Sequence, residues 1–221
     1  MITIPTRQHE DLHLRIYDKI ADHIRHGGYS WASTGSTTYP GHKALRVGLG
    51  LGQGDSGGLP EDVRPFGDDW PTLVVEAGWS QTIRALRQVM RWWFETSQHQ
   101  VKIVILTSFQ RVAGSNQIVV EKWIEAPRQS GIMESSRSAV LGALSPVLDH
   151  TITIDYRGPE ITAQSIATIS LDDFIVTRND MVIELAVLLL RDTQTAQDCV
   201  LTEAFWKDFG RRVWFSRVSR H

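Results

Sequence analysis

The sequence predicts an α/β protein with a central mixed β-sheet flanked by helices. Residues 72–75 are apolar or β-branched, as in a strand that is buried on both faces. Residues 80–97 repeat apolar side chains at helical spacing, and residues 101–109 form a second strongly apolar run. A strand, a helix and a strand in this order form a right-handed βαβ unit with parallel strands. We expect this unit to be the centre of the fold.

The composition is that of one soluble globular domain. The chain has 221 residues, of which 42% are hydrophobic and 22% are charged. Its net charge is -2, which excludes a global basic field, so a nucleic-acid partner would need a local basic patch. Cys199 is the only cysteine and excludes an internal disulfide or a cysteine-rich metal site.

No membrane partner is expected. The first seven residues lack the long apolar run of a signal peptide. The longest apolar run, residues 185–190, is far too short to span a bilayer. We therefore expect an intracellular protein, in the cytoplasm or the nucleus.

Residues 8–26 predict a first helix, because apolar residues recur at every fourth position from Leu12 to Ile24. Three histidines of this helix, His13, His23 and His26, are not paired with carboxylates at metal-ligand spacing, so we expect them at the surface. Glu10 in the first turn favours the helix dipole, although an acidic residue on a first helix can also assist a metal site.

Glycine dominates the next region. Residues 29–39 predict a strand or a bent hairpin, and residues 45–51 a short strand-like run. Four of the seven residues from 52 to 58 are glycine, which predicts a locally flexible loop. Asp55 lies within it, and the simplest role for a loop aspartate is to cap its own turn. Residues 59–70 should form an exposed loop.

The second helix, residues 80–97, has Ser80 as its expected N-cap. Arg84, Arg87 and Arg91 share one side of this helix. They are interpreted either as a solvated basic face or as a row of phosphate contacts.

The remaining chain predicts further strands and a final helix. Residues 118–124 alternate as an antiparallel edge strand does, and residues 151–156 form another strand after a loop around 128–146. Residues 181–190 fit a helix or a strand. Residues 202–218 predict a helix with a basic end, made of four arginines: Arg211, Arg212, Arg217 and Arg220.

Glu76 follows the first buried strand directly, and Gly78 ends that strand. Open α/β sheets place their chemistry at such strand ends. The alternative is a solvated or capping glutamate.

This order of elements resembles the core of the PD-(D/E)XK, or restriction-endonuclease-like, nuclease superfamily. A closer resemblance is to a group of uncharacterised fungal proteins that have this core and are related to the Uma2-type branch. The resemblance covers residues 8–125 of a single domain, with residues 126–221 as a C-terminal α/β extension packed on the core. It depends on four segments: Gly54-Asp55-Ser56, residues 70–81 (WPTLVVEAGWSQ), residues 86–93 and residues 101–105.

The resemblance implies that Asp55 and Glu76 are the first and second ligands of Mg²⁺ or Mn²⁺. Such a cation activates a water and stabilises charge on a phosphodiester. The family usually has a lysine two residues after the second acid, where this chain has Gly78. Relatives among the fungal proteins often carry an acidic residue near position 89, where this chain has Val89.

Other residues are candidates for the missing cation and for the water. Lys102 lies on the neighbouring strand, but four residues of offset put it roughly 13 Å from Glu76 along the strands. Arg84 or Arg87 is better placed to stabilise charge, which leaves the base role to metal-bound hydroxide. Gln81 could orient the attacking water, as a helix glutamine does in several relatives.

Three hypotheses follow. The first is a metal-dependent phosphodiesterase acting on DNA or RNA. The second is a nuclease fold that has lost catalysis and binds nucleic acid or a protein, as Gly78 indicates. The third is a structural module in which Glu76 only accepts backbone hydrogen bonds. Since many relatives are dimers, the resemblance also allows a homodimer.

Overall fold

A computed structural model gives the structure of the chain. It describes most of the sequence in nine segments: residues 7–35, 37–40, 51–79, 81–112, 115–127, 144–162, 165–178, 180–193 and 197–216. The predicted strand-like run at 45–50 and most of the predicted loop at 128–146 lie outside these segments, as do Ser80, Arg217 and Arg220.

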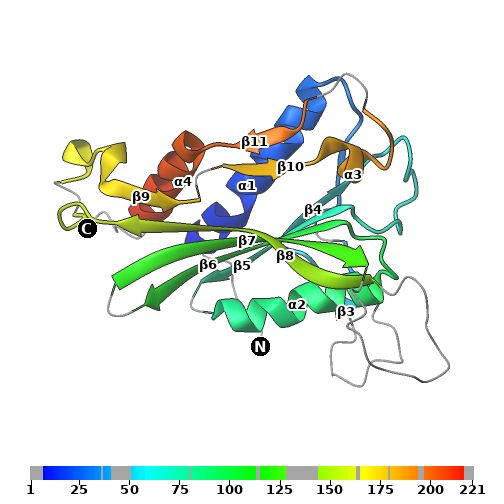
Figure 1. Ribbon diagram of the computed structural model, residues 1–221, viewed down its shortest axis with the longest axis horizontal. Helices are drawn as coiled ribbons and strands as arrows, with labels where there is room; N and C mark the ends of the chain where they lie inside the picture. The colour runs from blue at the N-terminus through cyan, green and yellow to red at the C-terminus, as the bar shows by residue number, and fades with distance from the viewer. Residues whose placement is uncertain are drawn as a thin grey trace.

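A seven-stranded mixed sheet forms the centre of the molecule (Figure 1). In spatial order its strands are β1 (Ala32–Ser33), β4 (Ser56–Leu59), β5 (Leu73–Trp79), β6 (Ile103–Val112), β7 (Ser115–Pro127), β8 (Leu144–Tyr156) and β9 (Phe174–Thr177). Strands β5 and β6 are parallel, while every other neighbouring pair in this sheet is antiparallel. The predicted α/β class, with its parallel pair joined by a helix, is confirmed.

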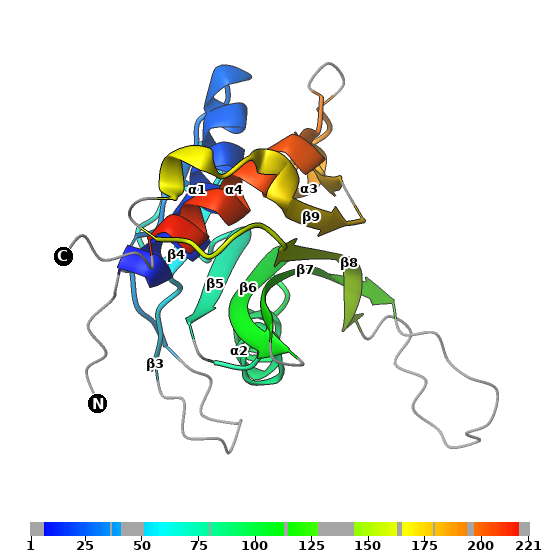
Figure 2. The ribbon, with the colours of Figure 1, turned by 90° about the vertical axis from the view of Figure 1, so that its left-hand side faces the viewer.

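Helices cover both faces of the sheet (Figures 1 and 2). One face carries α1 (Arg7–His26), α4 (Glu203–Phe215), the short α3 (Leu185–Leu189) and a two-stranded ribbon of β10 (Met181–Ile183) and β11 (Cys199–Leu201). The other face carries α2 (Ile83–Thr96). The small strands β2 (Tyr39–Pro40) and β3 (Leu51–Gly52) pair with each other beside the main sheet.

Alternation along β5 explains why this strand is central. Leu73, Val75 and Ala77 belong to the core under α1, whereas Val74 packs in the core under α2. Because successive side chains of a strand point to opposite faces, Glu76 shares the α2 face with Val74. The expectation that this run is buried on both faces is therefore confirmed.

The helix ends follow local capping rules, with one correction. The hydroxyl of Thr82 accepts a hydrogen bond from the Ala85 N–H and caps α2, so the expected start at residue 80 is wrong by three residues. Thr202 caps α4 in the same way through the Phe205 N–H.

The expectation that Gly78 ends the strand before Glu76 is wrong, because β5 continues through both residues to Trp79. Two further predictions about strands are wrong. Residues 56–59 form the buried strand β4 between β1 and β5, and not part of a flexible glycine loop. Strand β7 is not an edge strand, because β8 pairs along its other side. In both cases the missing information is long-range pairing, which a local pattern of residue types does not contain.

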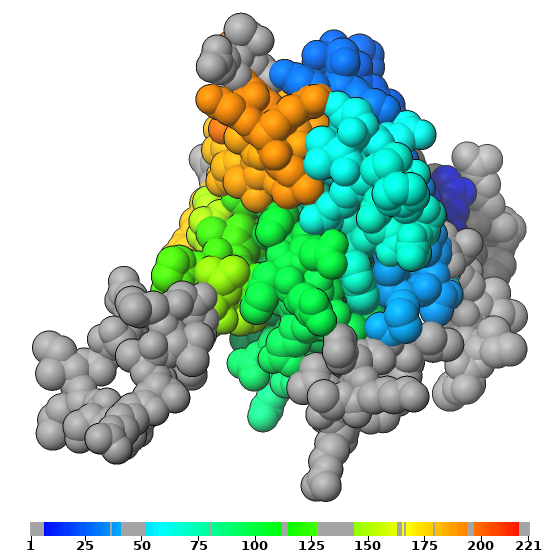
Figure 3. Space-filling model, turned by 90° about the vertical axis from the view of Figure 1, so that its right-hand side faces the viewer, coloured from blue at the N-terminus to red at the C-terminus, as the bar shows by residue number. Residues whose placement is uncertain are grey.

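The ambiguous segment 181–190 contains both structures, since β10 leads directly into α3. Beyond α3, Arg191 Nη1 lies 2.6 Å from Asp62 in the turn before β5. Figure 3 shows these orange and cyan segments side by side on one face of the molecule. Within the described segments, none of the helices has the length and apolar character needed to cross a membrane.

Candidate metal centre

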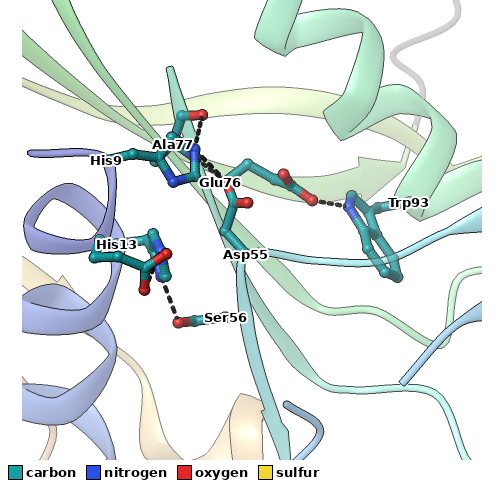
Figure 4. Close-up of polar contacts among 8 residues, drawn as sticks. His9, His13, Asp55, Ser56, Glu76, Ala77 and Trp93 are labelled. Atoms are coloured by element: carbon teal, nitrogen blue, oxygen red, sulfur yellow. Dashed lines mark hydrogen bonds and ion pairs between the residues drawn. The ribbon is translucent and has the colours of Figure 1, made fainter. Parts of the chain in front are cut away.

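The pairing of β4 with β5 brings Asp55 and Glu76 together. Ser56 lies opposite Val75 in this antiparallel pair, so the preceding residue, Asp55, lies level with Glu76. Asp55 Oδ2 accepts a hydrogen bond of 2.7 Å from the Ala77 N–H, which holds its carboxylate against β5. The two predicted metal ligands, 21 positions apart in the chain, are thus neighbours, with Asp55 just before β4 and Glu76 in the middle of β5 (Figure 4).

Glu76 is buried, with 7% of its surface exposed. Trp93 of α2 donates a hydrogen bond of 2.6 Å from Nε1 to Glu76 Oε1. Burial and, to a smaller extent, the Asp55 carboxylate raise the pKa of Glu76 to about 8, although the Trp93 hydrogen bond acts in the opposite direction. At neutral pH the carboxyl of Glu76 therefore retains a proton when no cation is bound.

On the other side of Asp55, two histidines of α1 face the site. His9 Nε2 donates to the carbonyl oxygen of Ala77 at 3.2 Å and lies 3.4 Å from Asp55 Oδ2. His13 Nδ1 and Ser56 Oγ share a hydrogen bond of 2.8 Å, and His13 Nε2 lies 3.4 Å from Glu10 Oε2. Figure 4 shows Asp55 between this helix and Glu76.

The prediction that His13 lies at the surface is wrong, because only 3% of it is exposed. Its burial lowers the pKa of the imidazole, while the Asp55 and Glu10 carboxylates act in the opposite direction. A sequence signal existed: His9 and His13 precede Ile16 and Ile20 at helical spacing, so all four share one face of α1. In the sequence, Trp93 is one of the apolar residues at helical spacing in α2, and no sequence signal connects it with Glu76.

Gln81 and Gly78 lie close together at the end of β5. Gln81 is exposed, and its backbone carbonyl oxygen accepts a hydrogen bond of 2.8 Å from the Ser108 hydroxyl. A Cβ atom at Gly78 would lie 3.0 Å from Gln81 Cβ and 3.1 Å from Leu86 Cδ1. A lysine at position 78 would therefore require Gln81 and Leu86 to shift by a few tenths of an ångström.

Lys102 is not brought to the carboxylates. Glu76 lies level with Leu106 in the parallel pair, so Lys102, which directly precedes β6, lies four residues away along the chain, as predicted. Its Nζ donates to the His99 carbonyl oxygen at 2.7 Å, and burial lowers its pKa.

The three arginines of α2 differ in their surroundings. Arg87 forms a two-point contact with Glu121 of β7, at 2.5 and 3.0 Å, and lies over the Trp123 ring. Arg84 and Arg91 are exposed. The side of α2 that carries these arginines therefore has two solvent-facing cations and a third that is held by a buried carboxylate.

The arrangement joins two carboxylates on adjacent strands to two imidazoles and a third carboxylate on α1. Carboxylate oxygens suit Mg²⁺ and Mn²⁺, and imidazole nitrogens extend the range to transition metals. Comparison of the chain with family models, with curated proteins and with solved structures finds no match.

Proposed function

We propose that this protein is a divalent-metal-dependent phosphodiesterase of the restriction-endonuclease-like class that acts on nucleic acid. The observation that carries the proposal is the side-by-side position of Asp55 and the buried, proton-retaining Glu76. Two adjacent carboxylates, of which one is buried, repel each other unless a proton or a cation compensates them. A divalent cation between them would replace the proton and offset the repulsion.

The donor set fits this cation. Asp55 and Glu76 supply oxygen ligands, which Mg²⁺ and Mn²⁺ prefer. Bound there, the cation would supply an activated water and stabilise charge on a phosphodiester. The order of elements also supports the class, because a first helix, an antiparallel pair, a helix and a parallel strand follow one another as in the core that the sequence resembles.

Nucleic acid is the expected substrate because of α2. Arg84 and Arg91 project into solvent from the helix that also holds Glu76 through Trp93. Arginines at this position would contact phosphates and direct a backbone to the metal. With a net charge of -2, the chain depends on such a local contribution.

Incubation of the purified protein with Mg²⁺ or Mn²⁺ and with single- and double-stranded DNA and RNA tests the proposal. Nicking is expected, and Glu76→Gln should abolish it, because the amide still accepts from Trp93 but carries no charge for a cation. Glu95→Gln, at an exposed position of α2, is the matched control and should retain activity. If neither metal supports cleavage of any of these substrates, the proposal is wrong.

A second candidate, favoured by Gly78, is a fold that retains cation binding but has lost catalysis. The usual lysine is absent, a side chain at position 78 would press on Gln81 and Leu86, and Lys102 is bound to the His99 carbonyl. This candidate predicts nucleic-acid binding that depends on Arg84 and Arg91, without cleavage. Electrophoretic mobility shifts measured beside the nicking assay separate the two candidates.

A further inference from the structure

The first turns of α1 carry three side chains with metal-ligating atoms. His9 and His13 are one helical turn apart, and Glu10 precedes His13 by three residues, so all three project from one side of the helix. One ligand atom from each of them lies within 4.8 Å of the others. Two histidines at this spacing on a helix are a common way to bind a metal ion.

The distances between the donors match coordination. His13 Nε2 lies 3.4 Å from Glu10 Oε2, and His9 Nε2 lies 3.4 Å from Asp55 Oδ2. Two ligands at 2.0–2.2 Å from a tetrahedral ion are about 3.3–3.6 Å apart. Each pair is therefore already spaced as two ligands of one ion. To bind it, the two pairs would approach each other, and His9 Nε2 would exchange its hydrogen bond to the Ala77 carbonyl oxygen for the ion, with the ring proton on Nδ1.

Ser56 supplies a supporting contact. Its Oγ holds His13 Nδ1 at 2.8 Å, which turns Nε2 toward Glu10. In metal sites the second nitrogen of a ligating imidazole is held in this way, so that the orientation of the ring is set before the metal binds. Ser56 and His13 are both buried, so the contact is shielded from water.

We infer that His9, Glu10, His13 and Asp55 form a second cation site, which takes a transition metal such as Zn²⁺ in preference to Mg²⁺. Two imidazole nitrogens favour Zn²⁺, whereas Mg²⁺ requires near-octahedral oxygen ligands. Two carboxylates with two neutral imidazoles have a formal charge of -2, which matches a divalent ion. The site goes beyond the proposed phosphodiesterase, although Asp55 lies between both sets of ligands.

Metal titration of the full chain, first freed of metal with a chelator, tests this inference. Calorimetry should show one Zn²⁺ bound in the presence of excess Mg²⁺. Both His9→Gln and His13→Gln should weaken this binding by at least about 10-fold. Because His13 is buried and its variant could unfold, His9→Gln, at a partly exposed position, provides an independent test. With Co²⁺ as the probe, the strong visible absorption of a tetrahedral site should appear in the wild-type chain and be absent in both variants.

His26→Gln is the matched control, since His26 lies at the exposed far end of the same helix, and it should leave Zn²⁺ affinity unchanged. Glu76→Gln should keep Zn²⁺ affinity within about threefold while removing the nicking expected with Mg²⁺. Zn²⁺ binding that is insensitive to both histidine variants overturns the inference. So does Zn²⁺ binding that is lost in Glu76→Gln, because the ion then lies between Asp55 and Glu76. Histidine-dependent Zn²⁺ binding without any nicking would uphold this site and contradict only the phosphodiesterase.

Discussion

At the scale of single residues, Glu76 combines burial with a neighbouring negative charge. Its carboxyl is buried and hydrogen-bonded to Trp93, and the Asp55 carboxylate adds charge repulsion. Both effects favour the protonated form of Glu76. In the metal-free site, a proton on Glu76 therefore removes the charge repulsion. Stability should therefore depend on pH in a direction opposite to that of an ordinary salt-bridged carboxylate.

The sign of this dependence follows from the two pKa values. The ordinary value is 4.5 and the folded value is about 8, so between these pH values the native chain holds a proton that the unfolded chain has lost. The contribution of Glu76 is fully present below pH 4.5 and is lost as pH rises to about 8. The slope is about 1.4 kcal/mol per pH unit at its steepest.

We predict that Glu76→Gln matches the wild type in unfolding free energy near pH 5 and exceeds it at pH 9 by several kcal/mol. Denaturant unfolding in the presence of a chelator, at a series of pH values, measures the difference, and titrating groups that do not interact with Glu76 cancel in the comparison. A difference that does not change with pH would show that Glu76 ionises normally in the fold.

At the scale of elements, β4 depends on glycine, because the Trp31 ring packs where a side chain at Gly58 would lie. A Cβ atom at Gly58 would lie 2.5–2.7 Å from three atoms of the Trp31 indole, which is itself buried and donates from Nε1 to the Tyr17 hydroxyl. Glycine therefore allows β4 to lie between β1 and β5 directly beneath this ring. The position of Asp55 beside Glu76 depends on the same strand.

We predict that Gly58→Ala destabilises the protein by about 1–3 kcal/mol, because the ring and the strand must separate to admit the methyl group. Thermal unfolding measures the loss. Gly67→Ala, in an exposed turn where nothing lies within 4 Å of the added Cβ, should change stability by less than ~0.5 kcal/mol. Equal effects at the two positions would contradict a close-packed β4.

The periodic pattern of α2 predicts which side of the helix is buried but not what its arginines contact. Its apolar stripe and its row of arginines are both visible in the sequence, and the stripe is buried as expected. The pattern does not distinguish Arg87, which reaches Glu121 of β7, from Arg84 and Arg91. That distinction depends on a residue 34 positions away in the chain.

At the scale of the whole molecule, Lys122 connects the long β7–β8 pair to the β10–α3 segment. Its Nζ contacts the Val182 carbonyl at 2.8 Å, Glu184 at 2.6 Å and Asp149 at 2.9 Å, and only 1% of its side chain is exposed. Lys122 pairs with His150 while Trp123 pairs with Leu148, so Asp149 is the extra residue of a bulge. The bulge thus supplies one of the carboxylates that neutralise this buried cation.

We predict that Lys122→Met lowers the unfolding free energy by about 1–3 kcal/mol. The loss stays below that expected for a fully buried pair, since Asp149 and Glu184 are more than a third exposed and regain water. Hydrogen–deuterium exchange should become faster in β10 and α3. Lys19→Met, at an exposed position of α1, should change neither measurement. Unchanged exchange in β10 and α3 would show that apolar packing alone holds this segment.

Much of the candidate site could be predicted from residues that follow one another in the chain. An acid, Glu76, follows a run of buried strand residues, and the offset of Lys102 follows from counting residues in a parallel pair. These are consequences of strand period and strand direction. The strand β4, which brings Asp55 beside Glu76, was not predicted. The roles of His13 and Trp93 could not be predicted in this way, because their hydrogen-bond partners, Ser56 and Glu76, belong to other elements.

The sequence by itself determined the α/β class, the β5–α2–β6 unit and the approximate extents of α1 and α4. The spacing of apolar residues indicates which positions are buried. A helix or a strand is long enough for this spacing to predict which of the two it is. Only the tertiary structure decided that a glycine-rich stretch is a central strand, that Lys122 is buried among carboxylates and that two histidines of α1 face Asp55. These features depend on contacts with residues distant in the chain, and the type of a single residue does not predict such contacts.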